Sequence, residues 1–137
     1  MDILNFAQLL EETKYGSQFN APLYYVVEKS DRIHAYGTLQ PHDYKVQRIG
    51  SVGEITFSEN FKYDKGFKFC KYDKVISHYI YPYTVYVATQ KQILIDKIKG
   101  DIDYRLTPLE DEAKSIKECI KKLKYSLQRL KVFENDK

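Results

Sequence analysis

The chain has 137 residues, of which 43% are hydrophobic and 30% are charged. This length and composition fit one globular domain that folds without a disulfide or a metal, and they exclude intrinsic disorder. The net charge of +3 and the pI near 8.7 exclude an acidic mimic of nucleic acid, and they permit phosphate binding without indicating it.

The residues at the start of the chain, 1–6, lack the basic region and the long apolar stretch of a signal peptide. No window approaches the roughly 18 consecutive apolar residues that would span a membrane. Cys70 and Cys119 lie far apart and show no metal-ligand spacing, so we expect two unpaired thiols. These features together predict a cytoplasmic protein that does not enter a membrane.

Residues 2–15 are predicted to form a short amphipathic helix. Its apolar residues recur on one face, at Ile3, Phe6, Leu9 and Leu10. We expect Asp2 to cap the first turn and Gly16 to follow the last one.

From residue 23 to residue 88 the pattern changes to short strands. The β-branched and aromatic run 23–27, the polar turn 30–32 and the run 33–39 predict a hairpin. Shorter strands are expected at 44–49 and 54–57, separated by Gly50 and Gly53.

Three further predictions complete the sheet. The segments 61–63 and 67–69 flank Asp64-Lys65-Gly66, which predicts a second hairpin. The segments 75–81 and 83–88 flank Pro82, which indicates an edge strand or a bend. Five to seven short strands of this kind predict a curled antiparallel sheet or a small barrel.

The last third of the chain is predicted to be a helical hairpin over 89–131, followed by a tail at 132–137. Thr89 and Gln92 have the spacing of a capping box at a first helix. Thr107 and Glu110 repeat that spacing around Pro108, at the position where a proline begins a helix without cost. We therefore expect a corner at residues 106–108.

The second of these helices carries an unbroken heptad seam over residues 109–130. Its apolar residues are spaced alternately four and three apart, as in a coiled coil: Leu109, Ala113, Ile116, Ile120, Leu123, Leu127 and Leu130. Two interpretations stay open. The seam packs against the preceding helix and the sheet, or part of it remains open to a partner protein or to a second copy of the chain.

The histidines, cysteines and acidic residues form no recognisable catalytic or metal-binding pattern in this sequence. His34, His42 and His78 are scattered, and none has a second ligand at helical spacing. A nucleophilic site would have to combine Cys70 with His78 or His34 and with Asp73, yet no glycine-rich elbow surrounds Cys70. We expect a protein that is not an enzyme and that needs no cofactor.

Basic and aromatic residues alternate in the segment 61–74, where the tetrapeptide Lys-Tyr-Asp-Lys occurs twice. Rings on one face of a strand with lysines beside them can bind single-stranded nucleic acid. The residues that would do so are Lys62, Tyr63, Phe67, Lys68, Phe69, Lys71 and Tyr72. The same alternation is also typical of a half-buried antiparallel strand, with aromatics inside and lysines outside.

A second candidate surface is the tyrosine-rich run 79–86. Tyr79, Tyr81 and Tyr83 would share one face if a strand continued straight through Pro82, and Tyr86 lies nearby in sequence. Exposed tyrosines favour protein interfaces because they give a large contact area at little cost in entropy. Packing of these rings into the core is the alternative.

These patterns predict an α+β fold: an N-terminal helix, a curled antiparallel sheet or small barrel, and a C-terminal helical hairpin, all in one domain over 1–137. The function we expect is a non-enzymatic protein-binding module that uses Tyr79, Tyr81, Tyr83 and Tyr86. Its short length and its richness in Lys, Ile, Tyr and Phe suggest an accessory protein of a phage or mobile element that inhibits a host enzyme or defence complex. A single-stranded nucleic-acid binder is the alternative function.

Overall fold

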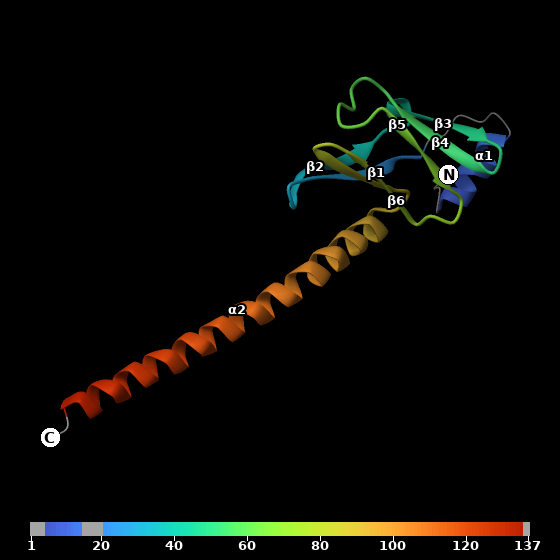
Figure 1. Cartoon of the computed structure of the whole chain (residues 1–137). Coiled ribbons are helices and arrows are strands. Elements are labelled where there is room, and N and C mark those ends of the chain that lie inside the picture. The colour runs from blue at the N-terminus through green and yellow to red at the C-terminus, as the bar shows by residue number, and fades with distance from the viewer. Residues whose placement is uncertain (1–4, 15–20, 136–137) are drawn as a thin grey trace. The chain divides into compact units, whose positions relative to one another are not determined.

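A computed structural model describes residues 5–14 and 21–135 (Figure 1). The order of elements is α1 (Phe6–Lys14), β1 (Leu23–Lys29), β2 (Arg32–Leu39), the 3-10 turn η1 (Pro41–Asp43), β3 (Tyr44–Ile49), β4 (Val52–Phe57), β5 (Gly66–Cys70), β6 (Val75–Ile80), β7 (Tyr83–Ala88) and α2 (Lys91–Asn135). The chain divides into two compact units, Met1–Lys97 and Ile98–Lys137. The prediction of a single domain over 1–137 stays a prediction.

The α+β class is confirmed, and the described residues form seven strands, the upper end of the predicted range. The strands make two antiparallel sheets with the orders β2-β1-β7-β6 and β3-β4-β5. The prediction of a small barrel was wrong, because within the described part of the chain the two sheets have separate edges that do not pair with each other. The second sheet is a simple meander, and pairing of β1 with β7 joins two hairpins into the first.

The predicted hairpin of β1 and β2 is confirmed, and a two-residue turn connects its strands. Ser30 and Asp31 both have positive φ, at 52° and 63°. A two-residue turn of this hand matches the twist of the flanking strands. Residues 44–49 and 54–57 also form strands as expected, with β4 starting two residues earlier than predicted.

The hairpin predicted around Asp64-Lys65-Gly66 was wrong. Residues 58–65 form a loop, and only the second half of that segment is a strand, β5, which pairs with β4. Phe61 anchors this loop because its ring is buried against Phe57 and Tyr25. Gly66 begins β5 at φ 149°, where a Cβ would stand 2.4 Å from the carbonyl oxygen of Ile55. The glycine therefore marks the close approach of two strands, and not a turn between them.

The core of the first unit lies beneath α1 and between the sheets. Figure 1 shows α1 alongside β3 and β4, and the helix buries Phe6 and Leu9 completely. A Cβ on Gly53 would lie 2.4 Å from the ring of Phe69 and 2.6 Å from Leu10, so this helix lies very close to the sheet. The backbone N–H of Gln8 donates to the Asn5 side chain at 2.8 Å, which caps the helix. The caps predicted at Asp2 and Gly16 lie outside the described residues.

The helical hairpin predicted over 89–131 was wrong, because α2 is one continuous helix of 45 residues with Pro108 inside it. Thr107 does not cap a second helix. Its hydroxyl donates to the carbonyl oxygen of Asp103 at 2.9 Å, as serine and threonine do inside helices. The Gln92 side chain donates to Asp96 at 2.8 Å, one turn further along the helix. No helix among the described residues is both long enough and apolar enough to cross a membrane.

Replacing Tyr44 by phenylalanine is expected to lower the free energy of unfolding by about 1 kcal/mol near pH 8, the usual net contribution of a hydrogen bond. The Tyr44 hydroxyl donates to the carbonyl oxygen of Ala21 at 2.6 Å in the core. Burial raises the pKa of Tyr44 to about 12, from 10.0. The unfolded chain therefore loses this proton at a lower pH than the folded chain, so the wild-type protein loses stability as pH rises from about 10 to about 12.

The phenylalanine variant has no such proton, so its deficit in stability should shrink above pH 10. Urea denaturation of both proteins at pH 8 and pH 11 measures this difference. Burial, Tyr63 and Asp43 also raise the pKa of Tyr25, in that order of effect, but Tyr25 is present in both proteins and cancels. A deficit that is unchanged or larger at pH 11 would show that Tyr44 is not buried in its protonated form.

Candidate functional site

The four-stranded sheet presents a tyrosine-rich surface on the side opposite the core. Val27, Val85 and Val87 point into the core, so the alternate residues of the same strands point outward. The strand register places these outward residues in three rows across the sheet: Thr38, Tyr24, Ala88 and Val75; Tyr36, Val26, Tyr86 and Ser77; and Ile33, Glu28, Thr84 and Tyr79. We call this set of twelve residues the tyrosine face. Ten of them are exposed or half-buried, whereas Val26 and Ala88 are buried.

Two rings at opposite edges of the tyrosine face are strongly exposed. Tyr36 on β2 is 77% exposed and Tyr79 on β6 is 65% exposed, with Ile33 at 51%. Between them Tyr24 and Tyr86 are half-buried, and the Tyr86 hydroxyl donates to Glu28 at 3.1 Å. This hydrogen bond fixes the Tyr86 ring, while the rings at the two edges remain accessible.

The tyrosine face carries almost no charge. Among its residues Glu28 is the one ionisable acid, and there is no lysine or arginine, although 30% of the chain is charged. Depletion of charge with enrichment of tyrosine is the composition of the centre of a protein–protein interface. Nucleic-acid binders neutralise phosphates with lysine and arginine, and this surface has neither.

The four tyrosines predicted to bind a partner divide between three environments. Tyr79 and Tyr86 belong to the tyrosine face. Tyr81 lies in the turn between β6 and β7, where it is 83% exposed. Tyr83 lies on the core side, packed against His34 and Tyr63. The chain reverses at Tyr81 and Pro82, so no straight strand aligns the first three rings.

Tyr24, Tyr36 and Ile33 belong to the face but were not singled out from the sequence. The signal that could have found them lies in the β1–β2 hairpin. Once its two-residue turn is assigned, Tyr36 stands opposite Val26, which points to the same side as Tyr24. The bulge between Val27 and Glu28 then shifts the register and brings Ile33 to this side as well.

The residues predicted to bind nucleic acid do not form a common surface. Phe67 and Phe69 are buried in β5 while Lys68 between them is exposed, as in a half-buried strand. Tyr63 is packed against the core, with its neighbour Lys62 exposed. Tyr72 is 83% exposed and the Lys71 ammonium lies 4.9 Å from its ring centre. Of the four rings only this one is exposed for stacking on a base.

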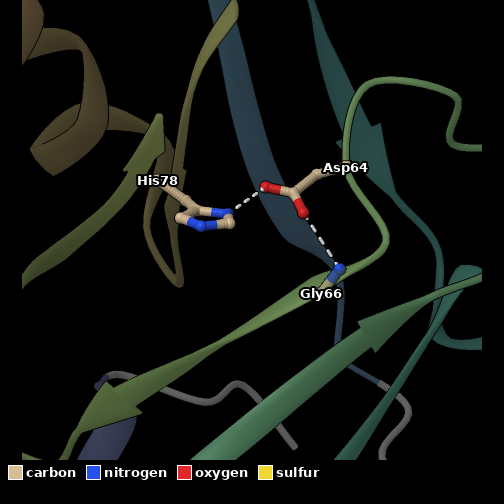
Figure 2. A network of polar contacts seen from close by, with 3 residues as sticks. All are labelled: Asp64, Gly66 and His78. Carbon is tan, nitrogen blue, oxygen red and sulfur yellow. Dashed lines mark hydrogen bonds and ion pairs between the residues drawn. The ribbon is translucent and has the colours of Figure 1, made fainter. Parts of the chain in front are cut away.

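A buried carboxylate pairs with a histidine on the core side of β6 (Figure 2). Asp64 Oδ2 lies 2.7 Å from His78 Nδ1, and Asp64 Oδ1 accepts the backbone N–H of Gly66 at 3.0 Å. The carboxylate is fully buried, whereas the imidazole is 36% exposed and stacks near Phe67. The pair fastens the loop of residues 58–65 to β6, a structural role that accounts for both of its hydrogen bonds.

Asp73, the acid in the catalytic combination weighed from the sequence, has a structural role. The Asp73 carboxylate accepts the backbone N–H of Cys70 at 2.9 Å, which closes the turn after β5. Cys70 is exposed and unpaired, and the His34 ring packs on Tyr63 and Tyr83. Within residues 5–14 and 21–135, no group of three or more His, Cys, Asp or Glu side chains could hold a metal ion.

The apolar seam predicted on the C-terminal helix is exposed along α2. The leucines and isoleucines at its positions between 106 and 130 have exposed fractions of 44% to 62%. Because α2 does not turn at Pro108, the seam continues toward its N-terminal side through Leu106 and Ile102 with the same spacing. This seam is a second surface that could bind a macromolecule.

No protein-family model, no curated protein and no solved structure matches the chain. Its function is therefore inferred from the side chains that the fold brings together.

Proposed function

We propose that the chain is a non-enzymatic protein-binding module and that the tyrosine face is its contact surface. The observation that carries the proposal is the near absence of charge among the ten exposed or half-buried residues of the tyrosine face, four of which are tyrosines. A rigid sheet holds these rings in place before binding, so little entropy is lost on contact. The partner is a protein whose own contact surface is largely apolar.

Two further observations favour a protein partner over nucleic acid. The face provides no cation for phosphate, and three of the four rings in the lysine–aromatic segment are packed inside. Inhibition of a host enzyme or defence complex is the mode of action we propose, since it requires only that a surface be covered. The proposal assigns no catalytic role to the buried Asp64–His78 pair, because both of its hydrogen bonds serve the fold.

Replacing Tyr36 and Tyr79 by alanine, singly and together, is expected to weaken binding to the partner. An interface tyrosine that acts as a hot spot contributes about 2 kcal/mol, so each single change should reduce affinity about 30-fold. The wild-type chain is used to capture its partner from a lysate of the cells in which it is naturally made. The affinity of the purified partner for each variant is then measured by calorimetry at two salt concentrations.

Tyr72→Ala is the matched control, since Tyr72 is 83% exposed but lies outside the tyrosine face. It should leave the affinity unchanged, and the wild-type affinity should vary little with salt. Equal loss with Tyr72→Ala and Tyr36→Ala would contradict the proposed surface. Binding of a single-stranded oligonucleotide that weakens steeply with salt would instead support the alternative function.

A further inference from the structure

The exposed seam of α2 has the length and regularity of a coiled-coil strand. From Ile102 to Leu130 every a and d position of the heptad is apolar, over 29 residues or roughly 42 Å of helix. Pro108 falls at a c position, on the far side of the helix from the seam. Most of the stability of a helix in a protein comes from packing of its apolar face. We therefore expect α2 to be stabilised when its exposed seam packs against another helix.

Charge is distributed very unevenly along the same helix. Residues 99–112 contain five acidic and two basic side chains, a net charge of −3. Residues 114–131 contain seven basic side chains and one acidic side chain, a net charge of +6. Two such helices attract each other when they run in opposite directions, because each acidic half then lies beside a basic half. In parallel they would place the two basic halves side by side.

We propose that α2 binds α2 of a second copy of this chain as an antiparallel coiled coil, in a register that places Ala113 of one copy opposite Ile116 of the other. In that register Leu109 faces Ile120, Leu106 faces Leu123 and Ile102 faces Leu127, so eight consecutive layers are apolar. Each a residue then meets a d residue, which lets the small Ala113 pack against a large side chain. A parallel pair would set Ala113 against itself and leave a gap.

The residues that flank the core select this register. The e positions of α2 are acidic in its first half and basic in its second, and e positions face each other in an antiparallel pair. The proposed register pairs Asp96 with Lys131, Asp103 with Lys124 and Glu110 with Lys117. A shift by one heptad in one direction would set Glu110 against Glu110, and a shift in the other would set Lys117 against Lys117.

The first test is the mass of the purified full-length protein by sedimentation equilibrium. The expected mass is twice the 16.2 kDa of one chain. Ile120→Asp buries a charge in the seam and should raise the dissociation constant at least about 100-fold. Tyr125→Asp adds the same charge at an exposed f position and should leave the dimer intact. A monomeric wild-type protein, or equal effects of both changes, would overturn the proposal.

The second test determines the direction of the two helices. In a Cys70→Ser, Cys119→Ser background, one batch carries Ala113→Cys and a tagged second batch carries Ile116→Cys. Oxidation of the mixed batches should give a disulfide between the two kinds of chain, with little between identical chains. A dominant disulfide between two Ala113→Cys chains would indicate parallel helices and overturn the proposal. Both tests use the purified chain alone, so they do not depend on the tyrosine face.

Discussion

Replacing His78 by alanine is expected to lower the free energy of unfolding by about 1.5–3 kcal/mol, the range for a hydrogen bond to a charged group. Asp64 is fully buried and relies on two contacts, with His78 Nδ1 at 2.7 Å and with the Gly66 backbone N–H. Removing the imidazole leaves a carboxylate in the core with one donor. Because the imidazole is 36% exposed, water can enter the gap and keep the loss below that of a fully buried ion pair.

Urea denaturation followed by near-ultraviolet circular dichroism measures this loss, because the signal comes from packed aromatic rings. His42→Ala is the control: His42 lies 3.5 Å from Asp43 but is 79% exposed, so its loss should change stability by less than about 0.5 kcal/mol. Adding Asp64→Asn to His78→Ala should restore part of the stability, since the amide keeps the Gly66 contact and carries no charge. Additive losses would show that the two side chains do not act as a pair.

The strands were predictable to the extent that their signals are local. The β1–β2 hairpin is encoded by a short polar turn between two alternating runs, and the structure has it where the pattern places it. Only two of the four tyrosines of the tyrosine face, Tyr79 and Tyr86, were predicted from the sequence. The face is assembled from four strands whose order depends on pairing between β1 and β7. That pairing joins residues about 60 positions apart, and no local pattern specifies it.

The Asp64–His78 pair illustrates the same limit at the level of one contact. The two residues are separated by 14 positions and by the whole of β5, so their spacing resembles no known motif. The segment around Gly66 was predicted to be a turn because aspartate and glycine favour turns. Here Gly66 allows the backbones of β5 and β4 to approach closely, and Asp64 contacts His78 on β6.

The error at residues 106–108 has a different cause. Thr-Pro-Leu-Glu is a strong helix-start pattern, and a proline at the first helical position costs nothing. Leu106 and Leu109, however, continue one heptad pattern on both sides of Pro108 without a change of phase. Two separate helices joined by a corner need not share one heptad phase. The unbroken seam was therefore the better guide to the continuous helix, and it outweighs the local capping signal.

Pro108→Ala is expected to stabilise α2 by about 2–3 kcal/mol, because a proline inside a helix costs about 3 kcal/mol and its stiffening of the unfolded chain offsets at most about 1 kcal/mol. The change restores a backbone N–H that can donate to the carbonyl of the preceding turn. Thermal unfolding of the full-length protein, followed by circular dichroism at 222 nm at fixed concentration, measures the gain. Gly100→Ala is the control for a smaller effect of about 1 kcal/mol, since a Cβ there meets nothing within 4 Å. If Thr107 and Pro108 began a second helix, alanine at 108 would leave the unfolding temperature unchanged, because a proline at a first helical position lacks no bond.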